Sequence, residues 1–402
     1  MTGWTKLAFG LALAGICASR AFGQGEARPD SKQPFEIVRS IQAIQDQVVR
    51  GNAGARAKLP TLIEQMTERL LMVERDVWRD PRNARAAVIY TLSGGQARVI
   101  RRVIEIGLSP EPERALMRGV LAYVEGHEAE AKKLLSGIDA KTLSPAAAGH
   151  IAMIQSALLA KEDPGKAMQL LDEARVLAPG TLVEETALRR ELVLADEIDD
   201  IDKFTFLSSE YIWRFPESAY FESFRQRFVV SAVHFALTIK PAQYAALEEL
   251  IGQVNAAGRL GLYLLIAQKG IIDGKPGIAR FAAEKAIQLS AEGSVERARS
   301  KFYEAAALIL TDQFEKGVNE LSEVDASRLP KQDTELKQAV ASMAKIIGNV
   351  SGNPQGPVAL DQDEHRTSLT GDSPATASVS ALIDLAQQKL GQTDEVLERK
   401  AP

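Results

Sequence analysis

The stretch "EDPGKAMQLLDEARVLAPG", residues 162–180, decides the fold. Ala167, Leu171, Ala174 and Pro179 lie in it at offsets 0, 4, 7 and 12. A small residue, a large one and a second small one at helical spacing, ended by a proline, are typical of the second helix of a tetratricopeptide-like repeat. The small residues let the two helices of a repeat approach closely, so this stretch predicts a tightly packed helix pair.

Three other stretches repeat this spacing at offsets 0, 4 and 7 along the chain. They contain Ala131, Leu135 and Ile138; Ala279, Ala283 and Ala286; and Gly317, Leu321 and Val324. No run of alternating apolar and polar residues bounded by hairpin turns accompanies them, which argues against strands. The sequence therefore predicts an all-α, tetratricopeptide-like α-solenoid of antiparallel helix pairs. An irregular helical bundle remains the alternative, because each copy is degenerate.

The helical pattern is expected to occupy residues 35–348, after a polar leader at 24–34. Residues 349–376 are rich in Gly, Pro, Ser, Thr and Asp, which predicts a disordered linker. Residues 377–402 resume an amphipathic pattern with Val379, Leu382, Ile383, Leu385 and Ala386. This C-terminal helix either docks on the body or captures a partner.

The N-terminus has the pattern of a secretory signal peptide over residues 1–23. Lys6 precedes a run of about a dozen apolar residues, and Ala21 and Gly23 form a small-x-small site, so cleavage is expected after Gly23. Cys17 is the one cysteine of the chain, and Ile16 before it does not favour lipidation. The mature protein would then lie in the periplasm and contain no cysteine.

"LSGG", residues 92–95, matches the signature loop of ABC-type ATPases. Such an ATPase also needs a phosphate-binding loop, and the nearest match, residues 270–276, is one residue short and has Pro276 in place of the hydroxyl residue. The alternative is that Gly94 and Gly95 end one helix and begin the next, and it is the interpretation we favour.

No catalytic or metal-binding pattern stands out. His127, His150, His234 and His365 have neither a paired spacing nor a zinc-binding motif around them. The acidic pairs Glu184-Glu185 and Asp196-Glu197 are interpreted as solvated helix faces, although a hydrolase that uses them remains a third hypothesis. The net charge of −5 is evenly mixed and gives no nucleic-acid footprint. We expect a protein that is not an enzyme and uses no cofactor.

The aromatic-rich stretch at residues 204–228 is the candidate partner-binding region. Aromatic and arginine side chains are enriched in binding hot spots, and we select Tyr211, Trp213, Arg214 and Phe215. Tyr211, Trp213 and Arg214 are expected to be exposed at a helix end before Pro216. For the stretch as a whole we favour core packing over partner binding, because Tyr220, Phe224 and Phe228 follow one helical stripe.

Four segments together resemble the MotC family, periplasmic motility proteins of rhizobial-type α-proteobacteria. They are "PFEIVRSIQAIQDQVVRGN" (34–52), "DPRNARAAVIYTLSGG" (80–95), "LAPGTLVEETALRRE" (177–191) and "IWRFPESAYFESFRQRFV" (212–229). The similarity covers most of residues 34–340. The resemblance implies a non-enzymatic protein that binds the periplasmic part of the flagellar stator protein MotB and supports flagellar rotation. The alternative function is a generic periplasmic tetratricopeptide-like adaptor in cell-envelope assembly.

Overall fold

The computed structural model describes residues 33–351, which form seventeen α-helices, four short 3-10 helices and no strand. This finding confirms the predicted all-α fold. The predicted signal peptide (1–23) and C-terminal helix (377–402) lie outside the described residues, as does almost all of the predicted leader and linker. The last helix continues to Ser351, three residues past the predicted end of the helical body.

The α-helices are α1 (Pro34–Val49), α2 (Ala53–Leu71), α3 (Pro81–Leu92), α4 (Ala97–Ile106), α5 (Glu113–Val124), α6 (Glu128–Leu135), α7 (Pro145–Leu159), α8 (Pro164–Leu177), α9 (Leu182–Glu197), α10 (Ile201–Arg214), α11 (Phe221–Thr238), α12 (Tyr244–Gly252), α13 (Ala256–Ile272), α14 (Pro276–Leu289), α15 (Val295–Ile309), α16 (Phe314–Glu323) and α17 (Lys331–Ser351). The 3-10 helices are Arg75–Arg79, Ala140–Thr142, Pro241–Gln243 and Ala326–Arg328.

Local signals in the sequence set many of the helix starts. Helices α3, α7, α8 and α14 begin with a proline, whose fixed φ suits the first helical position and whose missing N–H leaves no unpaired donor there. Asp163 accepts a hydrogen bond from the amide of Lys166 at the start of α8, and Asn255 accepts one from Gly258 at the start of α13. Such caps satisfy backbone donors that the helix itself cannot pair.

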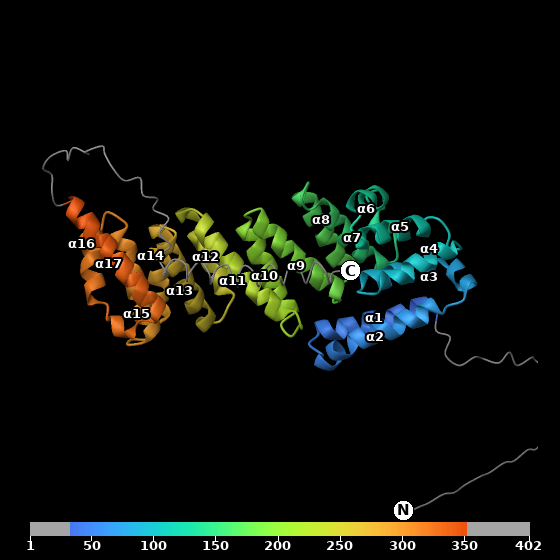
Figure 1. The fold of residues 1–402 in the computed structure, drawn as a ribbon, viewed down its shortest axis with the longest axis horizontal. Coiled ribbons are helices and arrows are strands. Elements are labelled where there is room, and N and C mark those ends of the chain that lie inside the picture. Colours follow the sequence, from blue (N-terminus) through green and yellow to red (C-terminus); the bar gives the residue numbers. More distant parts are fainter. Residues whose placement is uncertain (1–32, 352–402) are drawn as a thin grey trace, which may run out of the picture.

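The helices form an elongated row of antiparallel pairs that runs from α3 to α17 (Figure 1). Within the row, α5 packs on α6, α7 on α8, α9 on α10, α13 on α14 and α15 on α16. The contacts between pairs divide the helices into two layers. In one layer α9, α11, α13 and α15 contact one another in turn, and in the other α10 contacts α12. This arrangement is that of the predicted solenoid.

The repeated small residues lie where the two helices of a pair meet. Ala167, Ala174, Ala131, Ala279, Ala283 and Ala286 are all fully buried, and each lies on the second helix of its pair. The close approach is seen, for example, at α13 and α14, where a Cβ atom built on Gly270 would lie 2.9 Å from the Cβ atom of Ala279. The spacing in residues 162–180 and its copies therefore encodes the contact surface of the repeat.

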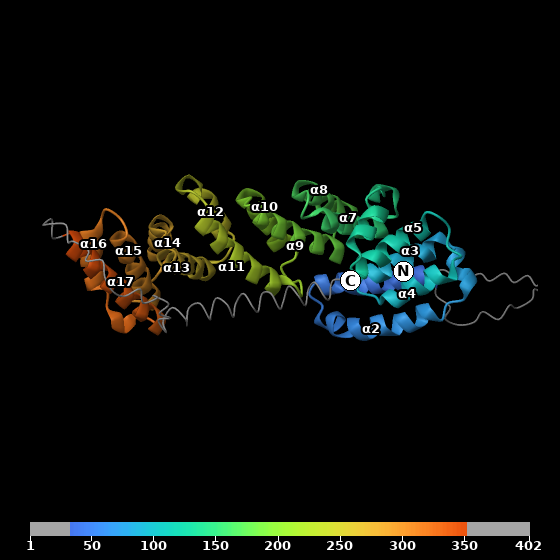
Figure 2. The same ribbon diagram turned by 45° about the horizontal axis from the view of Figure 1, so that its top comes forward.

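The α1–α2 hairpin departs from the linear order of the row. It folds back beside the other helices, so that α1 contacts both α3 and α9 (Figures 1 and 2). The amide of Leu182, at the start of α9, donates to Asp46 of α1 at 3.3 Å. The turn after α1 also meets the turn after α10, because a Cβ atom on Gly51 would lie 2.6 Å from the carbonyl oxygen of Glu217.

The "LSGG" stretch is the turn between α3 and α4, as predicted. Gly94 has a φ of +91°, which lies in the left-handed region that favours glycine. The amide of Gly95 donates to the carbonyl of Tyr90 at 2.9 Å, and a Cβ atom there would lie 2.4 Å from the Tyr90 ring. Both glycines are thus explained by backbone geometry, without a nucleotide.

Two glycine substitutions on α13 test the close approach of α13 and α14. Gly270→Ala should lower the free energy of unfolding by about 1–3 kcal/mol, because the new methyl group overpacks against Ala279. Gly261→Ala is the matched control on the same helix. No atom lies within 4 Å of its Cβ position, so it should stabilise by about 0.4–1 kcal/mol. Urea unfolding monitored by circular dichroism measures both, and equal effects would contradict the close-packing argument.

Candidate interaction surface

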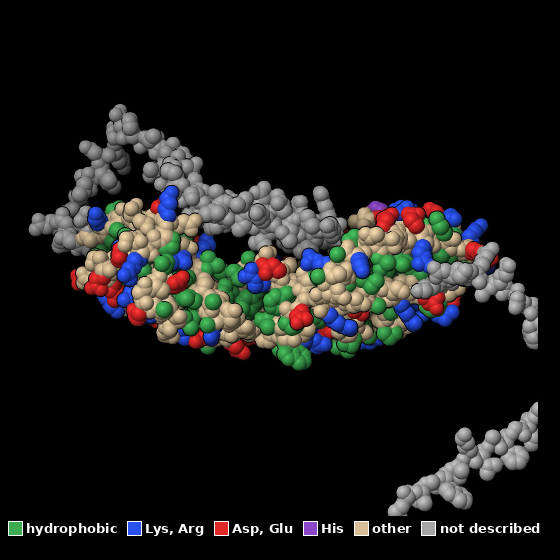
Figure 3. Space-filling view, turned by 90° about the horizontal axis from the view of Figure 1, so that it is seen from below, with side chains coloured by type: hydrophobic (Ala, Val, Ile, Leu, Met, Phe, Trp, Pro, Cys, Tyr) green, Lys and Arg blue, Asp and Glu red, His purple; other side chains and the backbone are tan. Residues whose placement is uncertain are grey.

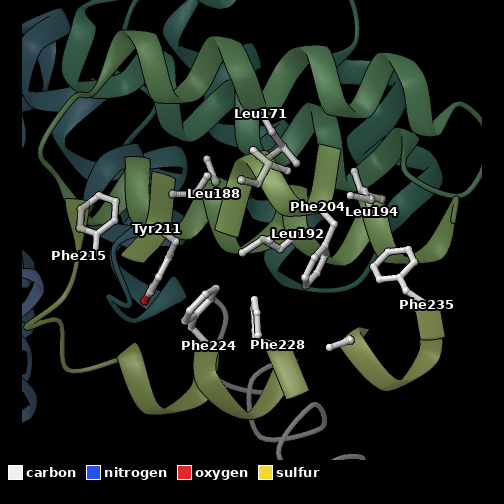
Figure 4. Packing of buried hydrophobic residues seen from close by; sticks show 14 of the residues in the cluster. Leu171, Leu188, Leu192, Leu194, Phe204, Tyr211, Phe215, Phe224, Phe228 and Phe235 are labelled. Carbon is white, nitrogen blue, oxygen red and sulfur yellow. The ribbon is translucent and has the colours of Figure 1, made fainter. Parts of the chain in front are cut away.

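The aromatic-rich stretch forms α10, the turn after it and the first half of α11. Helix α10 ends at Arg214, two residues before Pro216. This is expected, because proline disfavours a helical conformation in the residue that precedes it. Phe204 and Tyr211 of α10 meet Phe224, Phe228 and Phe235 of α11 beneath α9 (Figure 4). The ring centroids of Tyr211 and Phe224 are 4.2 Å apart and stacked. Most of these rings are therefore core residues, which agrees with the core packing that we favour from the sequence.

Tyr211 and Phe215 belong to this core. Tyr211 has an exposed fraction of 0%, so the prediction that it is exposed is wrong. Its hydroxyl group donates to Glu185 Oε1 at 2.6 Å, inside the protein. Phe215 is also buried, with its ring centroid 5.7 Å from that of Tyr211. Both rings support the surface from below and neither is available to a partner.

Trp213 and Phe206 lie on the outer face of α10. Their exposed fractions are 78% and 56%, so the predicted exposure of Trp213 is confirmed. The two residues are seven positions apart, which places them on one side of the helix, two turns from each other. The sequence pointed to Trp213 because it stands next to a helix end, whereas Phe206 was missed among the core aromatics.

Arg214 is partly exposed and held in place by two carboxylates. Its guanidinium group lies 2.8 Å from Glu184 of α9 and 3.7 Å from Glu210 one turn back on α10. Glu184 is buried and also accepts a hydrogen bond from the amide of Gly180 at 2.5 Å. This pairing fixes the direction of Arg214 while one third of its side chain, 32%, remains accessible.

The acidic pair Glu184-Glu185 does not form a solvated face, so the interpretation from the sequence is wrong. Both side chains are buried. Glu185 accepts hydrogen bonds from Tyr211 and from the hydroxyl group of Ser218. Sequence periodicity could not show this, because the donors come from residues 26 and 33 positions away along the chain. The second pair differs, since Asp196 accepts a bond of 2.8 Å from His234 at a partly exposed site.

Arg175 joins helices α8, α9 and α10 beneath the outer face. Its guanidinium group lies 3.0 Å from Glu191 of α9 and 3.2 Å from Glu210 of α10. Glu191 is fully buried, and burial raises the pKa of its carboxyl group to about 8. Asp172 raises this pKa further, and Arg175 opposes the shift. The ionic contacts hold α8 and α10 side by side.

The outer residues of these two helices form one surface, which we call the α8–α10 face. It consists of Val176, Phe206, Trp213 and Arg214. Val176, next to Arg175 on α8, is 79% exposed. Isolated apolar residues on a surface are normal, but a tryptophan beside an oriented arginine is the composition that binding hot spots favour. The face can therefore bind a partner that offers an apolar pocket next to a carboxylate or carbonyl group.

The turn after α10 contacts the protein itself on its other side. The amide of Ala219 donates to the carbonyl of Val48, and Arg56 donates to the carbonyl of Ala219, both at 3.5 Å. The α1–α2 hairpin therefore covers this side of the turn, and the two exposed aromatic rings of the stretch, Phe206 and Trp213, both lie on α10.

Among residues 33–351, no group of three or more His, Cys, Asp or Glu side chains could hold a metal ion. Among the helices described, none combines the length and the apolar character needed to cross a membrane. His150 is buried against Ser93 and Ala146, and burial lowers its pKa to about 4, so it is a neutral core residue.

Comparison with known proteins gives one consistent result. The family model described as "Chemotaxis protein MotC" matches residues 2–402. The chain is also similar to the chemotaxis protein MotC of Rhizobium meliloti (strain 1021), with 26% identity over 340 residues. The aligned part is 84% of this chain and 77% of that protein. No solved structure matches the chain.

The different roles of Tyr211 and Trp213 can be tested by stability. Tyr211→Phe removes the donor to the buried carboxylate of Glu185, whose other oxygen has no hydrogen-bond partner, and should cost about 1–3 kcal/mol. Trp213→Ala removes an exposed side chain and should change the free energy of unfolding by less than about 0.5 kcal/mol. Urea unfolding compares the two, and a larger loss for Trp213→Ala would contradict this assignment.

The raised pKa of Glu191 predicts a pH dependence of stability. The unfolded carboxyl group ionises near 4.5 and the folded one near 8. Between these values the folded protein keeps a proton that the unfolded chain has lost, so stability falls as pH rises, by up to about 1.4 kcal/mol per pH unit. Glu191→Gln removes this dependence, whereas Glu197→Gln, at the exposed end of the same helix, keeps it. Urea unfolding at pH 5 and pH 8 measures the difference. Identical pH profiles for the wild type and Glu191→Gln would show that Glu191 does not titrate in this way.

Proposed function

The chain belongs to the MotC family of chemotaxis proteins, and we propose that it binds the periplasmic part of the flagellar stator protein MotB and thereby supports flagellar rotation. Membership confirms the resemblance drawn from residues 34–229 and makes the protein a chemotaxis and motility protein. The stator partner and the periplasmic location are the parts that belong to the proposal.

The α8–α10 face is the observation that supports this proposal. Of the large apolar side chains that are most exposed among residues 33–351, Val176, Phe206 and Trp213 lie together on two helices joined by Arg175. Exposed apolar groups of this kind mark interaction sites when they are grouped. Trp213 would insert into an apolar pocket of the partner, and Arg214 would pair with a polar group at the rim of that pocket.

The proposed mechanism is the presentation of a rigid surface, without covalent chemistry. Arg214 is oriented before binding by Glu184 and Glu210, so little side-chain entropy is lost when the partner binds. The rings of Tyr211 and Phe224 hold α10 in position from below. A preorganised surface of this kind suits a scaffold protein that holds a stator component in place.

A periplasmic location follows from the N-terminal sequence in this proposal. Residues 1–23 carry the signal-peptide pattern, with Lys6 before an apolar run and a small-x-small site at Ala21 and Gly23. These residues lie outside the described range. Mass spectrometry of the protein purified from whole native cells should find Gln24 as the first residue, and a chain beginning at Met1 would contradict export and cleavage.

Binding of the mature chain, residues 24–402, to the periplasmic domain of MotB from the same organism tests the proposal. We expect saturable binding that Trp213→Ala weakens by roughly tenfold or more, because exposed tryptophans dominate hot spots. Phe206→Ala should weaken it less. Met72→Ala is the matched control, since Met72 is 80% exposed but lies between α2 and the first 3-10 helix.

The contrary result is also informative about function. Absence of binding at tens of micromolar, with the protein folded by circular dichroism, would reject the stator proposal. It would favour the adaptor in cell-envelope assembly. Equal loss from Trp213→Ala and Met72→Ala would keep MotB as the partner but place its binding site elsewhere.

A further inference from the structure

A second apolar surface lies on the opposite layer of the solenoid, along α11 and α13. Val230 of α11 and Leu265 and Ile272 of α13 have exposed fractions of 39%, 40% and 42%. Val233 and Leu237 of α11 are partly buried beside them. We call these five residues the α11–α13 strip. In the view of Figure 3, hydrophobic side chains gather in the hollowed middle of the body, between more charged ends.

The strip continues an interface that α17 already occupies. Asp333, in the first turn of α17, is buried and accepts hydrogen bonds from Gln268 at 2.8 Å and from Tyr303 at 2.5 Å. Arg299 pairs with the same carboxylate at 2.6 Å. Gln268 lies on α13 three residues after Leu265 and four before Ile272, on the same side of the helix. The start of α17 therefore lies at the edge of the strip.

Helix α17 shows what kind of segment this layer accepts. In α17 the side chains that face the body are Asp333, Leu336, Val340 and Ala344, at offsets 0, 3, 7 and 11. Leu336 is partly buried and the other three are buried. The sequence of the C-terminal segment has Val379, Leu382, Ile383, Ala386 and Leu390 at offsets 0, 3, 4, 7 and 11. An amphipathic helix with this spacing would present one apolar side of three turns to a groove.

The length of chain after α17 matches the distance to the strip. Residues 352–378, 27 residues, join the end of α17 to Val379. A flexible chain of this length spans about 26–31 Å on average. The tether begins at Ser351, the far end of α17, and at a rise of about 1.5 Å per residue that end lies about 27 Å from Asp333, the residue beside the strip. The local concentration of a tethered ligand is highest when these two lengths agree.

We propose that residues 379–390 of the same chain dock as an amphipathic helix on the α11–α13 strip. The strip, the interface continued from α17, the matching apolar spacing and the length of the tether all support this occupant. Docking would cover the apolar surface of α11 and α13 and leave the α8–α10 face, on the other layer, open to a partner. This inference does not depend on the identity of that partner.

Amide hydrogen exchange of the full mature chain tests the proposal. Leu382→Asp combined with Ile383→Asp places charges in the apolar side of the segment and should accelerate exchange in α11 and α13 by about tenfold, the factor expected if nine molecules in ten are docked. Ala381→Asp combined with Gln388→Asp is the matched control. It adds the same two charges on the side of the helix opposite Val379, and should leave exchange unchanged.

A variant in the body provides the reciprocal measurement. Leu265→Asp changes an exposed side chain of the strip, and circular dichroism checks that the body remains folded. It should release the segment, so that amides of residues 379–390 exchange at the rate of an unstructured peptide. Because docking is intramolecular, protection should not change over a roughly hundredfold dilution of the protein.

Three results would overturn the proposal. The first is equal exchange in α11 and α13 for the wild type and the double variant. The second is equal acceleration by the control pair (Ala381→Asp with Gln388→Asp) and by the pair on the apolar side, which would point to a general effect of charge. The third is protection that falls on dilution, which would assign the strip to a second copy of the chain.

Discussion

Close contact between the two helices of each pair is the constraint on which the rest of the structure depends. Ala279 on α14 meets Gly270 on α13 so closely that no Cβ atom fits on the glycine without displacement. The same chemistry recurs at Ala167 and Ala174 on α8. Tight pairs leave the larger apolar side chains free to pack between pairs, and this packing extends the solenoid from one repeat to the next.

Buried carboxylates on α9 transmit this packing to the surface. Glu184 orients Arg214, Glu185 fixes Tyr211 and Ser218, and Glu191 meets Arg175, so one helix organises both the core and the α8–α10 face. Polar groups inside a protein are unfavourable unless they are paired, and here each of the three has a partner from another segment. The conformation of the outer face is thereby coupled to the stability of the body.

The solenoid has two layers, and they differ in what they present. On the layer of α8 and α10, single apolar side chains stand beside an oriented arginine, which suits a specific protein partner. On the layer of α11 and α13, the α11–α13 strip lies beside the docked start of α17, which suits a helix of the same chain. Separate surfaces would let the protein bind a stator component while its own C-terminal segment stays docked.

The sequence by itself determined the fold class and the repeat, because small residues at offsets 0, 4 and 7 and proline stops act within a single helix pair. It indicated the family, through the four segments that resemble it. It also located the "LSGG" turn and the exposure of Trp213. The tertiary structure alone decided that Tyr211 and Phe215 are buried, that Glu184 and Glu185 are core residues, and that α1 folds back on α9. These features depend on groups such as Ser218 and Leu182, which are brought together from segments far apart in the chain. Local periodicity states which side of a helix is apolar, but it does not state which distant donor will meet a carboxylate on that side.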